Sequence, residues 1–196
     1  MANIACLLLA AGQARRFGDV KQIQTVDGTA LIRIVYDRLA GIFGTDLYVV
    51  LGANATQVAP ALPPLPANHI IYNQDWASGM GASIAAGIKS LQHLNYDAIM
   101  IALADQIAIT TDDYAGLIDK LDDKTIICAR YNDRCGAPAI FPAQHFEYLA
   151  KLNNDAGARD LLKQETGVIA VPVPSAAIDI DTMDDLDRWK AQHSVT

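Results

Sequence analysis

The stretch LLLAAGQARRFGDVKQ, Leu7 to Gln22, begins as an apolar run and changes within a few residues into a loop with two glycines, two arginines and a lysine. An apolar run without polar alternation is typical of a strand buried on both faces, as in parallel sheets. In open parallel sheets, ligands bind beyond the carboxyl ends of the strands. The stretch therefore predicts a first buried strand that ends directly at a ligand-binding loop.

Further strands and helices alternate along the chain. Apolar runs without alternation lie at 47–52, 98–104 and 167–173, and apolar residues recur at helical spacing over 29–43, 81–94 and 111–123. This alternation predicts an α/β fold, a three-layer sandwich with a mostly parallel, Rossmann-like sheet. The proline-rich segment 60–66 is interpreted as a surface loop rather than an interdomain linker, because a strand-like run follows at once. We expect one domain over residues 1–196.

The composition limits the kinds of partner. The chain has 196 residues, of which 52% are hydrophobic, and 15 Lys and Arg against 22 Asp and Glu give a net charge of -7. An acidic chain repels nucleic-acid phosphates, so we expect no nucleic-acid partner and only local anion-binding groups. No run approaches the length of a membrane span and the start lacks a basic leader, so we expect a soluble cytoplasmic protein without a membrane partner.

The chain has three cysteines, Cys6, Cys128 and Cys135, and none stands in a Cys-x-x-Cys spacing. An odd number of cysteines without that spacing argues against a zinc site or a redox motif. We expect three reduced thiols, with Cys6 and Cys128 packed in the core as small apolar groups.

The cationic loop fits neither of two familiar phosphate-binding motifs. A P-loop has four residues between its glycines and then Lys-Ser/Thr, whereas Gly12 and Gly18 are separated by five and followed by Asp19. A dinucleotide fingerprint also fails, because GMGASI at 79–84 ends in isoleucine. What remains is a glycine loop whose arginines and lysine can neutralise a polyphosphate. The alternative is a solvated basic surface loop.

The loop resembles the signature L-A-A-G-x-S-x-R-F/M-G-x-x-K-Q of the nucleotidyltransferases related to molybdenum cofactor cytidylyltransferase. The resemblance implies the nucleotide-diphospho-sugar transferase type of fold and a nucleoside triphosphate site, with catalytic cations Arg16 and Lys21. It also implies nucleotide contacts from five residues of the loop: Leu9, Ala10, Ala11, Gly12 and Arg15. Guanylyl-transferring relatives more often carry L-A-G-G here, so the double alanine favours CTP.

A second block, NQDWASGMGASIAAGI at 73–88, is similar to the family segment that lies against the nucleoside. It makes Asn73, Gly79, Gly81 and Ser83 candidates for contacts to base or ribose. Its glycines lead into a helix whose first turn presents free amides. The alternative is a tight loop in which the glycines are needed only because the backbone adopts a positive φ.

The run AIMIALADQI at 98–107 ends in a carboxylate, Asp105. Mg²⁺ is usually held by one or two carboxylates together with phosphate oxygens, so a carboxylate at the same sheet edge as the cationic loop suits metal-assisted phosphoryl transfer. Asp105 resembles the family's metal-binding and catalytic aspartate, although Ile107 replaces the usual proline and puts the rigidity of the turn in question. The alternative is a capping or turn aspartate.

The second carboxylate is expected from AIDIDTMDDLDRW at 177–189. Alternation along this segment predicts Asp179 and Asp181 on one face and the two isoleucines on the other. Thr182 can cap the helix that follows. The segment resembles the family's D-I-D-T-P-E-D-L, and one of the two aspartates, with Asp181 preferred, completes the metal site.

Two more blocks resemble the acceptor side of the family, residues 135–142 and 153–162. In the second block Asp155, Gly157 and Arg159 match, whereas Asn154 stands where the family has glycine. The alternative is that Asp155 caps a helix and Arg159 forms a surface ion pair.

Together the resemblance implies an Mg²⁺-dependent enzyme that transfers CMP from CTP to the phosphate of molybdopterin or molybdenum cofactor and releases pyrophosphate. It further implies transient contact with a molybdoenzyme or its chaperone. Two alternatives stay open: another phosphorylated acceptor such as a sugar phosphate, and a non-catalytic nucleotide-binding protein.

Overall fold

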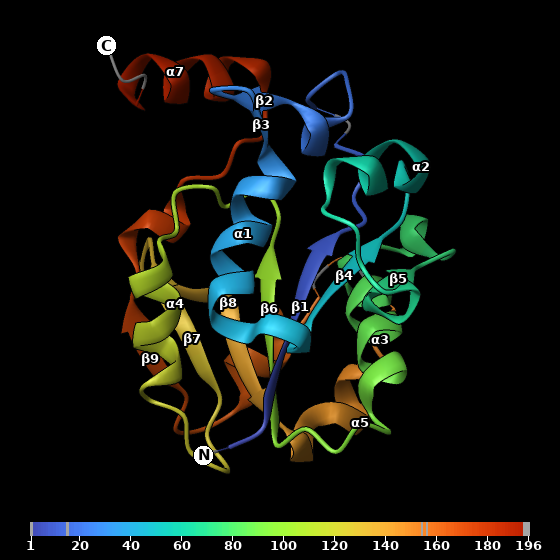
Figure 1. The fold of residues 1–196 in the computed structure, drawn as a ribbon. Coiled ribbons are helices and arrows are strands. Elements are labelled where there is room, and N and C mark those ends of the chain that lie inside the picture. The colour runs from blue at the N-terminus through green and yellow to red at the C-terminus, as the bar shows by residue number, and fades with distance from the viewer. Residues whose placement is uncertain (1, 15, 154, 156, 194–196) are drawn as a thin grey trace.

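The computed structural model describes residues 2–14, 16–153, 155 and 157–193, and these form a seven-stranded sheet between two layers of helices (Figure 1). The strands are β1 (Ile4–Ala10), β4 (Leu47–Leu51), β5 (Ile70–Tyr72), β6 (Ala98–Leu103), β7 (Ile127–Tyr131), β8 (Arg134–Pro142) and β9 (Ile169–Pro172). Their order is β5-β4-β1-β6-β8-β7-β9, and among these strands only β8 runs antiparallel to its neighbours. The predicted α/β fold with a mostly parallel sheet is confirmed.

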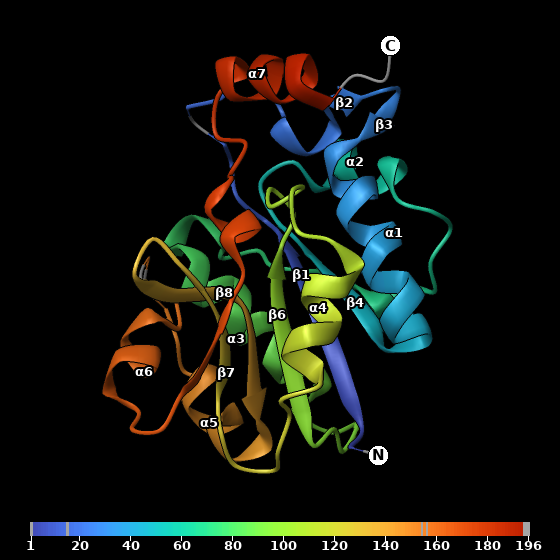
Figure 2. The ribbon, with the colours of Figure 1, turned by 90° about the vertical axis from the view of Figure 1, so that its left-hand side faces the viewer.

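The pleat of β1 explains why helices cover both faces. Cys6, Leu8 and Ala10 point into the core beneath α1 (Leu31–Phe43) and α4 (Thr111–Ile118). The alternate residues Ala5, Leu7 and Leu9 point into the core on the opposite face, beneath α3 (Met80–Leu91), α5 (Phe146–Leu149) and α6 (Arg159–Gln164). Figure 2 shows the two helical layers on either side of the sheet. A strand buried on both faces needs apolar residues at every position, which is the pattern of the opening stretch.

The shorter elements complete the chain. They are the hairpin β2 (Thr25–Val26) and β3 (Thr29–Ala30), α2 (Ala55–Val58), α7 (Met183–His193) and the 3₁₀ turns Lys21–Ile23, Gly44–Asp46, Ala59–Ala61, Ala67–His69, Trp76–Ser78, Ala143–His145 and Pro174–Ala177. The helix α7 lies beside the β2–β3 hairpin, beyond the carboxyl ends of β1 and β6 (Figures 1 and 2). The Asp185 amide donates to Thr182 Oγ1 at 3.2 Å and the Thr182 amide to Asp185 Oδ2 at 2.9 Å, so the predicted cap is confirmed.

Two predictions from the pattern of apolar residues need correction. The run at 167–173 was expected to be buried on both faces, but β9 is an edge strand whose residues alternate between half-buried and exposed. The segment around Asp179 is extended without being a strand, and Ile180 is buried whereas Ile178 is 45% exposed. Apolar composition alone does not reveal which strand the chain places at the edge of a sheet.

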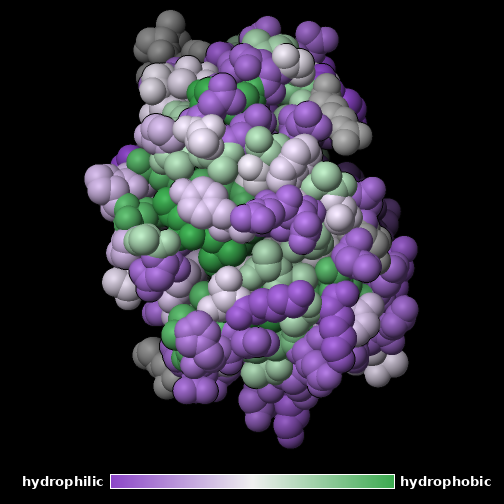
Figure 3. Space-filling view, turned by 90° about the vertical axis from the view of Figure 1, so that its right-hand side faces the viewer, coloured by the Kyte–Doolittle hydropathy of each residue, from purple (hydrophilic) through white to green (hydrophobic). Residues whose placement is uncertain are grey.

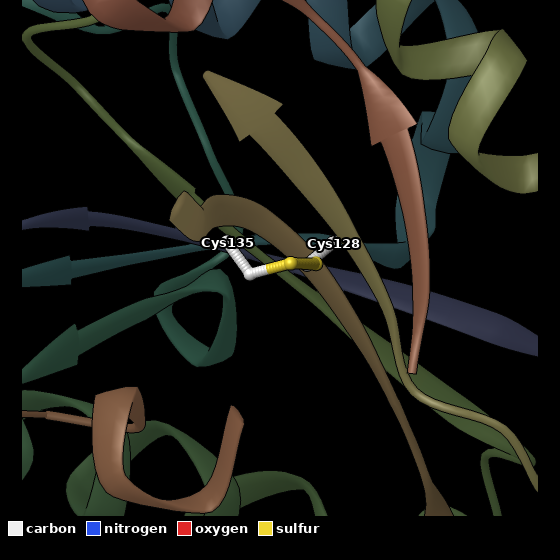
Figure 4. Close-up of a disulfide and its surroundings, with 2 residues drawn as sticks. All are labelled: Cys128 and Cys135. Atoms are coloured by element: carbon white, nitrogen blue, oxygen red, sulfur yellow. A yellow bond between two sulfur atoms is a disulfide. The ribbon is translucent and has the colours of Figure 1, made fainter. Parts of the chain in front are cut away.

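The expectation of three reduced thiols is also wrong. Cys128 of β7 and Cys135 of β8 form a disulfide between these neighbouring strands (Figure 4). A bulge after Cys128 shifts the strand register, and the two Cα atoms lie 5.7 Å apart, within the usual range for a disulfide. Cys6 is a free, buried thiol, and its burial raises its pKa.

The sheet edge formed by β5 carries an exposed aromatic residue, Tyr72, which is 60% accessible. Figure 3 shows this side of the molecule, with apolar side chains gathered near its middle and polar side chains over much of the rest. A three-residue edge strand offers little backbone for pairing with another chain. Within the described residues, no helix has the length and apolar character needed to cross a bilayer.

Candidate active site

The glycine loop is held in place by the side chain of Gln22. Its Nε2 donates to the carbonyl oxygens of Ala10 at 3.2 Å and Gly12 at 2.8 Å, and the residue is buried. The loop also packs closely against the end of β4, where a Cβ on Gly52 would lie 2.6 Å from the Ala11 carbonyl oxygen. Gln22 matched the signature but had no assigned role, and nothing in the pattern pointed to Gly52.

A cavity of about 480 Å³ lies at the carboxyl ends of β1 and β6. Of the predicted site residues, it is lined by Leu9, Ala10, Ala11, Gly12, Lys21, Gly79, Ser83 and Asp105. The predicted acceptor residue Asp155 lines it as well, and so does Trp76, which follows the Asn73 block and was expected to line the site. Leu103 also lines it, and the sequence did not single it out as a contact. The glycine loop and Asp105 are almost a hundred residues apart in the chain, yet both line this cavity.

Charged side chains from three segments meet at the edge of this cavity. Lys21 Nζ lies 2.8 Å from Asp105 Oδ2 and 3.1 Å from Asp181 Oδ1, and its side chain is only 10% exposed. Arg16, 78% exposed, places Nη2 2.8 Å from the other oxygen of Asp181. The structure thus brings the predicted cations and carboxylates into a single cluster, in which Lys21 and Asp105 line the cavity whereas Arg16 and Asp181 do not.

The electrostatics of the cluster follow from its burial and its excess of carboxylates. Burial alone would lower the pKa of Lys21, but the charges and hydrogen bonds of Asp105 and Asp181 outweigh it and raise that pKa above its ordinary value. Burial, followed by repulsion from Asp105 and Asp181, raises the pKa of Asp179 to about 6. Asp179 therefore belongs to the same electrostatic cluster as the other two aspartates.

The carboxylates fit a divalent cation in part. Asp105 Oδ1 and Asp179 Oδ1 are buried, and within the described chain neither accepts a hydrogen bond. Across residues 2–14, 16–153, 155 and 157–193, no group of three or more His, Cys, Asp or Glu side chains is arranged so that it could bind a metal ion. Mg²⁺ is commonly held by one or two carboxylates plus phosphate oxygens, so two unpartnered oxygens in a negative cluster suit a metal that arrives with phosphate.

The second predicted block divides into cavity wall and support. Asn73 Nδ2 donates to Ser83 Oγ at 3.1 Å, and its Oδ1 accepts from the Asp75 amide at 3.0 Å, so Asn73 braces the turn before α3 rather than lining the cavity. Gly79 has φ of 105°, as the alternative interpretation required, whereas Gly81 lies within α3 and is buried. Gly79 therefore both lines the cavity and has a positive φ, whereas Gly81 is not among the residues that line the cavity.

The turn after Asp105 is held without the family's proline. Arg38 of α1 donates through Nη1 to the carbonyl oxygens of Ile107 and Ile109, the latter at 2.7 Å. The buried Gln106 donates through Nε2 to Ala137 O at 3.2 Å and to Ala176 O at 3.0 Å. Hydrogen bonds from distant segments therefore fix the turn, and no local signal marks Arg38 for this role.

A second cavity of about 540 Å³ adjoins the first, since Met80 and Leu103 line both. Its wall includes Cys135, Gly136, Ala137, Ala139, Phe141, Ala158 and Arg159, so the two blocks predicted for the acceptor side meet here. Arg134 and Lys163 add positive charge to this wall. The predictions for Arg15 and Asn154 fall on positions outside the described residues.

Comparison with known proteins agrees with this geometry. Residues 6–168 match the family described as MobA-like NTP transferase domain. The chain is 30% identical to a nicotine blue oxidoreductase of Paenarthrobacter nicotinovorans, with 93% of this chain and 94% of the relative covered.

Two solved structures share the fold. The structure of Rv0371c from Mycobacterium tuberculosis H37Rv in complex with manganese superposes with a TM-score of 0.77 at 24% identity, covering 98% of this chain and all of the other. Molybdopterin-guanine dinucleotide biosynthesis protein A from Archaeoglobus fulgidus has a TM-score of 0.69 at 17% identity, with 97% and 98% of the two chains covered. With the family match spanning most of its length, the chain belongs to the MobA-like NTP transferases and is a nucleotidyltransferase.

Proposed function

We propose that this protein transfers CMP from CTP to the terminal phosphate of molybdopterin or molybdenum cofactor, with Mg²⁺ as the metal and pyrophosphate as the leaving group. The observation that carries the proposal is the contact of Lys21 with both Asp105 and Asp181 at the edge of the glycine-loop cavity. Cations for a triphosphate and carboxylates for a metal are the two charge sets that phosphoryl transfer requires.

The residues divide the work by charge. The backbone of the loop at Gly12, together with Lys21 and Arg16, would bind the triphosphate and stabilise the charge that develops on pyrophosphate. Asp105 with Asp181 or Asp179 would hold the metal, which neutralises phosphate charge when bound. The acceptor phosphate forms a bond to the α-phosphorus as the bond to the β-phosphate oxygen breaks, so catalysis rests on positioning and neutralisation.

The two cavities suit the two substrates. The first cavity, which reaches Gly79 and Ser83, would take the nucleoside and triphosphate. The second combines apolar side chains with three cations, Arg134, Arg159 and Lys163, against one carboxylate, Asp133, which suits a ring system that carries a phosphate. The double alanine at Ala10 and Ala11 supports cytosine only through the resemblance. The proposal includes one domain, a cytoplasmic location and transient contact with a molybdoenzyme or its chaperone.

Pyrophosphate release tests the proposal. The purified protein is incubated with Mg²⁺ and CTP, GTP, ATP or UTP, with and without molybdopterin. We expect release with CTP that depends on the acceptor, and loss of release in Asp105→Asn but not in the surface variant Arg33→Gln. Release with another nucleotide would discard the cytidine assignment, and acceptor-dependent release with a sugar phosphate would change the acceptor. No release with any nucleotide, from folded protein that binds CTP, would overturn the proposed transfer.

The relative named nicotine blue oxidoreductase supplies a second candidate, an oxidoreductase that acts on nicotine blue, because its identity of 30% extends over nearly the whole chain. The carboxylate and cation cluster favours phosphoryl transfer over this candidate, since reduction of nicotine blue has no need of carboxylates grouped with cations beside a glycine loop. Bleaching of nicotine blue by the protein with a reduced nicotinamide dinucleotide, without pyrophosphate release in the first assay, would favour the oxidoreductase.

A further inference from the structure

We propose that Lys21 and Arg16 compete with the divalent cation for Asp105 and Asp181, so that metal and nucleoside triphosphate enter the site together. The inference rests on the metal site of the proposed function and adds to it the order in which the site fills. In this arrangement the cations that will bind phosphate also keep the carboxylates occupied until phosphate arrives.

The geometry shows which oxygens are occupied. Lys21 Nζ contacts Asp105 Oδ2 and Asp181 Oδ1, and Arg16 Nη2 contacts Asp181 Oδ2. Both oxygens of Asp181 and one oxygen of Asp105 are therefore already in contact with a positive charge. The remaining Asp105 Oδ1 is buried without a hydrogen-bond partner in the described chain. A metal that used both carboxylates would have to displace at least one ammonium or guanidinium contact.

The charges indicate that a metal ion would replace the cationic side chains at the carboxylates while those side chains move to the phosphates. Asp105 and Asp181 together contact two cationic side chains, Lys21 and Arg16, and one divalent ion carries the same charge as those two together. A metal that binds alone would place its charge beside Lys21 and Arg16 with no anion to receive them. A triphosphate that binds alone would draw both cations away and leave three carboxylates in mutual repulsion. Each ligand therefore removes the obstacle to the other.

The burial of Lys21 strengthens the effect. Its side chain is 10% exposed, so water would solvate its ammonium group poorly if the group lost its contacts with the carboxylates. Arg16 is 78% exposed and can move into solvent at low cost. Lys21 should therefore be the main competitor and Arg16 the weaker one. Linkage requires that the coupling be the same in both directions, and typical couplings between sites are roughly 5–150-fold.

Metal binding without turnover tests the exchange. Mn²⁺ is titrated into nucleotide-free protein, and free Mn²⁺ is followed by its electron paramagnetic resonance signal. We expect Lys21→Met to bind Mn²⁺ about tenfold more tightly than the wild type, within the usual range of couplings. Arg16→Gln should gain about twofold to threefold, because its contact is exposed. The gain is diagnostic, since the same variants should lose affinity for CTP.

Controls separate this inference from the metal site itself. Arg33→Gln removes an exposed arginine that pairs with Asp37 on α1, and we expect unchanged Mn²⁺ affinity. Asp105→Asn should abolish the tight Mn²⁺ site. Arg16→Gln alters an exposed side chain and keeps the test decisive if Lys21→Met does not fold. If Asp105-dependent Mn²⁺ binding is present but neither variant gains affinity, the exchange is wrong and the proposed function stands. If no form binds Mn²⁺ either alone or with CTP present, both fail.

Discussion

At the scale of single residues, the site depends on backbone positions as much as on charged side chains. Gln22 contributes by holding two carbonyl oxygens of the glycine loop, which fixes the path of the loop backbone beside the cavity. Gly79 contributes a conformation with φ of 105° and ψ of -176°, which is almost confined to glycine. Both lie beside the cavity, and neither carries a charge.

Gly79→Ala adds a single methyl group, but we expect it to lower both the stability of the protein and its affinity for CTP. A Cβ at this position would meet Asp155, with the Asp155 Cα only 2.8 Å away, in a backbone conformation that disfavours side chains. We expect a loss of about 1–3 kcal/mol in the free energy of unfolding, measured by urea denaturation, together with weaker CTP binding.

The matched control for Gly79 is Gly116→Ala within α4. A Cβ there meets nothing within 4 Å and φ is not positive. We expect this variant to gain up to about 1 kcal/mol, because alanine favours a helix. Equal effects of the two substitutions would contradict the assigned role of Gly79.

At the scale of elements, the turn between β6 and α4 places Asp105 at the cluster. The turn has no proline, and its rigidity comes from Arg38 on α1 and from Gln106. The buried Ile107 packs into the core on the α1 side of the sheet. Ile107 stands where the family has proline, and hydrogen bonds from other elements compensate for the rigidity that a proline would give the turn.

Arg38→Met should loosen this turn while keeping much of the apolar stem. It leaves the carbonyl oxygens of Ile107 and Ile109 without their donor, at an expected cost of about 1–3 kcal/mol in the free energy of unfolding. Because Asp105 lies two residues before Ile107, Mn²⁺ affinity should also fall severalfold in calorimetric titration.

Arg33→Met, on the same helix, tests whether any lost arginine would have this effect. Its side chain is 39% exposed and forms an i,i+4 ion pair with Asp37, worth about 0.3–0.5 kcal/mol. We expect nearly unchanged stability and Mn²⁺ binding. An Arg38→Met variant that behaved like Arg33→Met would refute the bracing of the turn.

At the scale of the whole molecule, the fold brings three carboxylates close together, and their mutual repulsion lowers the stability of the folded state. Asp179 lies near Asp105 and Asp181, and its pKa of about 6 stands above the ordinary value of 3.8. Between these two pH values the folded state binds more protons at Asp179 than the unfolded state does. The contribution of this residue to stability therefore falls as pH rises from about 4 to 6, and it is unfavourable above that range.

Asp179→Asn should consequently be more stable than the wild type at pH 7. We expect a gain on the order of 1 kcal/mol, after allowance for the partial exposure of the carboxyl group. Urea denaturation in the presence of a chelator measures the difference, which should shrink toward zero at pH 4. A difference that is the same at both pH values would show that Asp179 does not titrate in this way.

Much of the site was predictable because its chemistry lies in short local patterns. The residues from Leu9 to Gly12, with Lys21, Asp105, Gly79 and Ser83, were predicted and line one cavity. Asn73 shows the limit of such patterns, since it braces a turn behind the cavity wall. Arg38 and Gly52 carried no local signal, because their roles depend on segments far away in the chain.

The sequence by itself determined the class of fold and several of its strands and helices, because the spacing of apolar residues decides which faces can be buried, and buried parallel strands need apolar runs. Only the tertiary structure decided that 167–173 forms an edge strand, that Cys128 meets Cys135, and that Lys21 lies between Asp105 and Asp181. These contacts join residues through strand order and register. Such long-range geometry is set by the packing of the whole core, and local periodicity does not encode it.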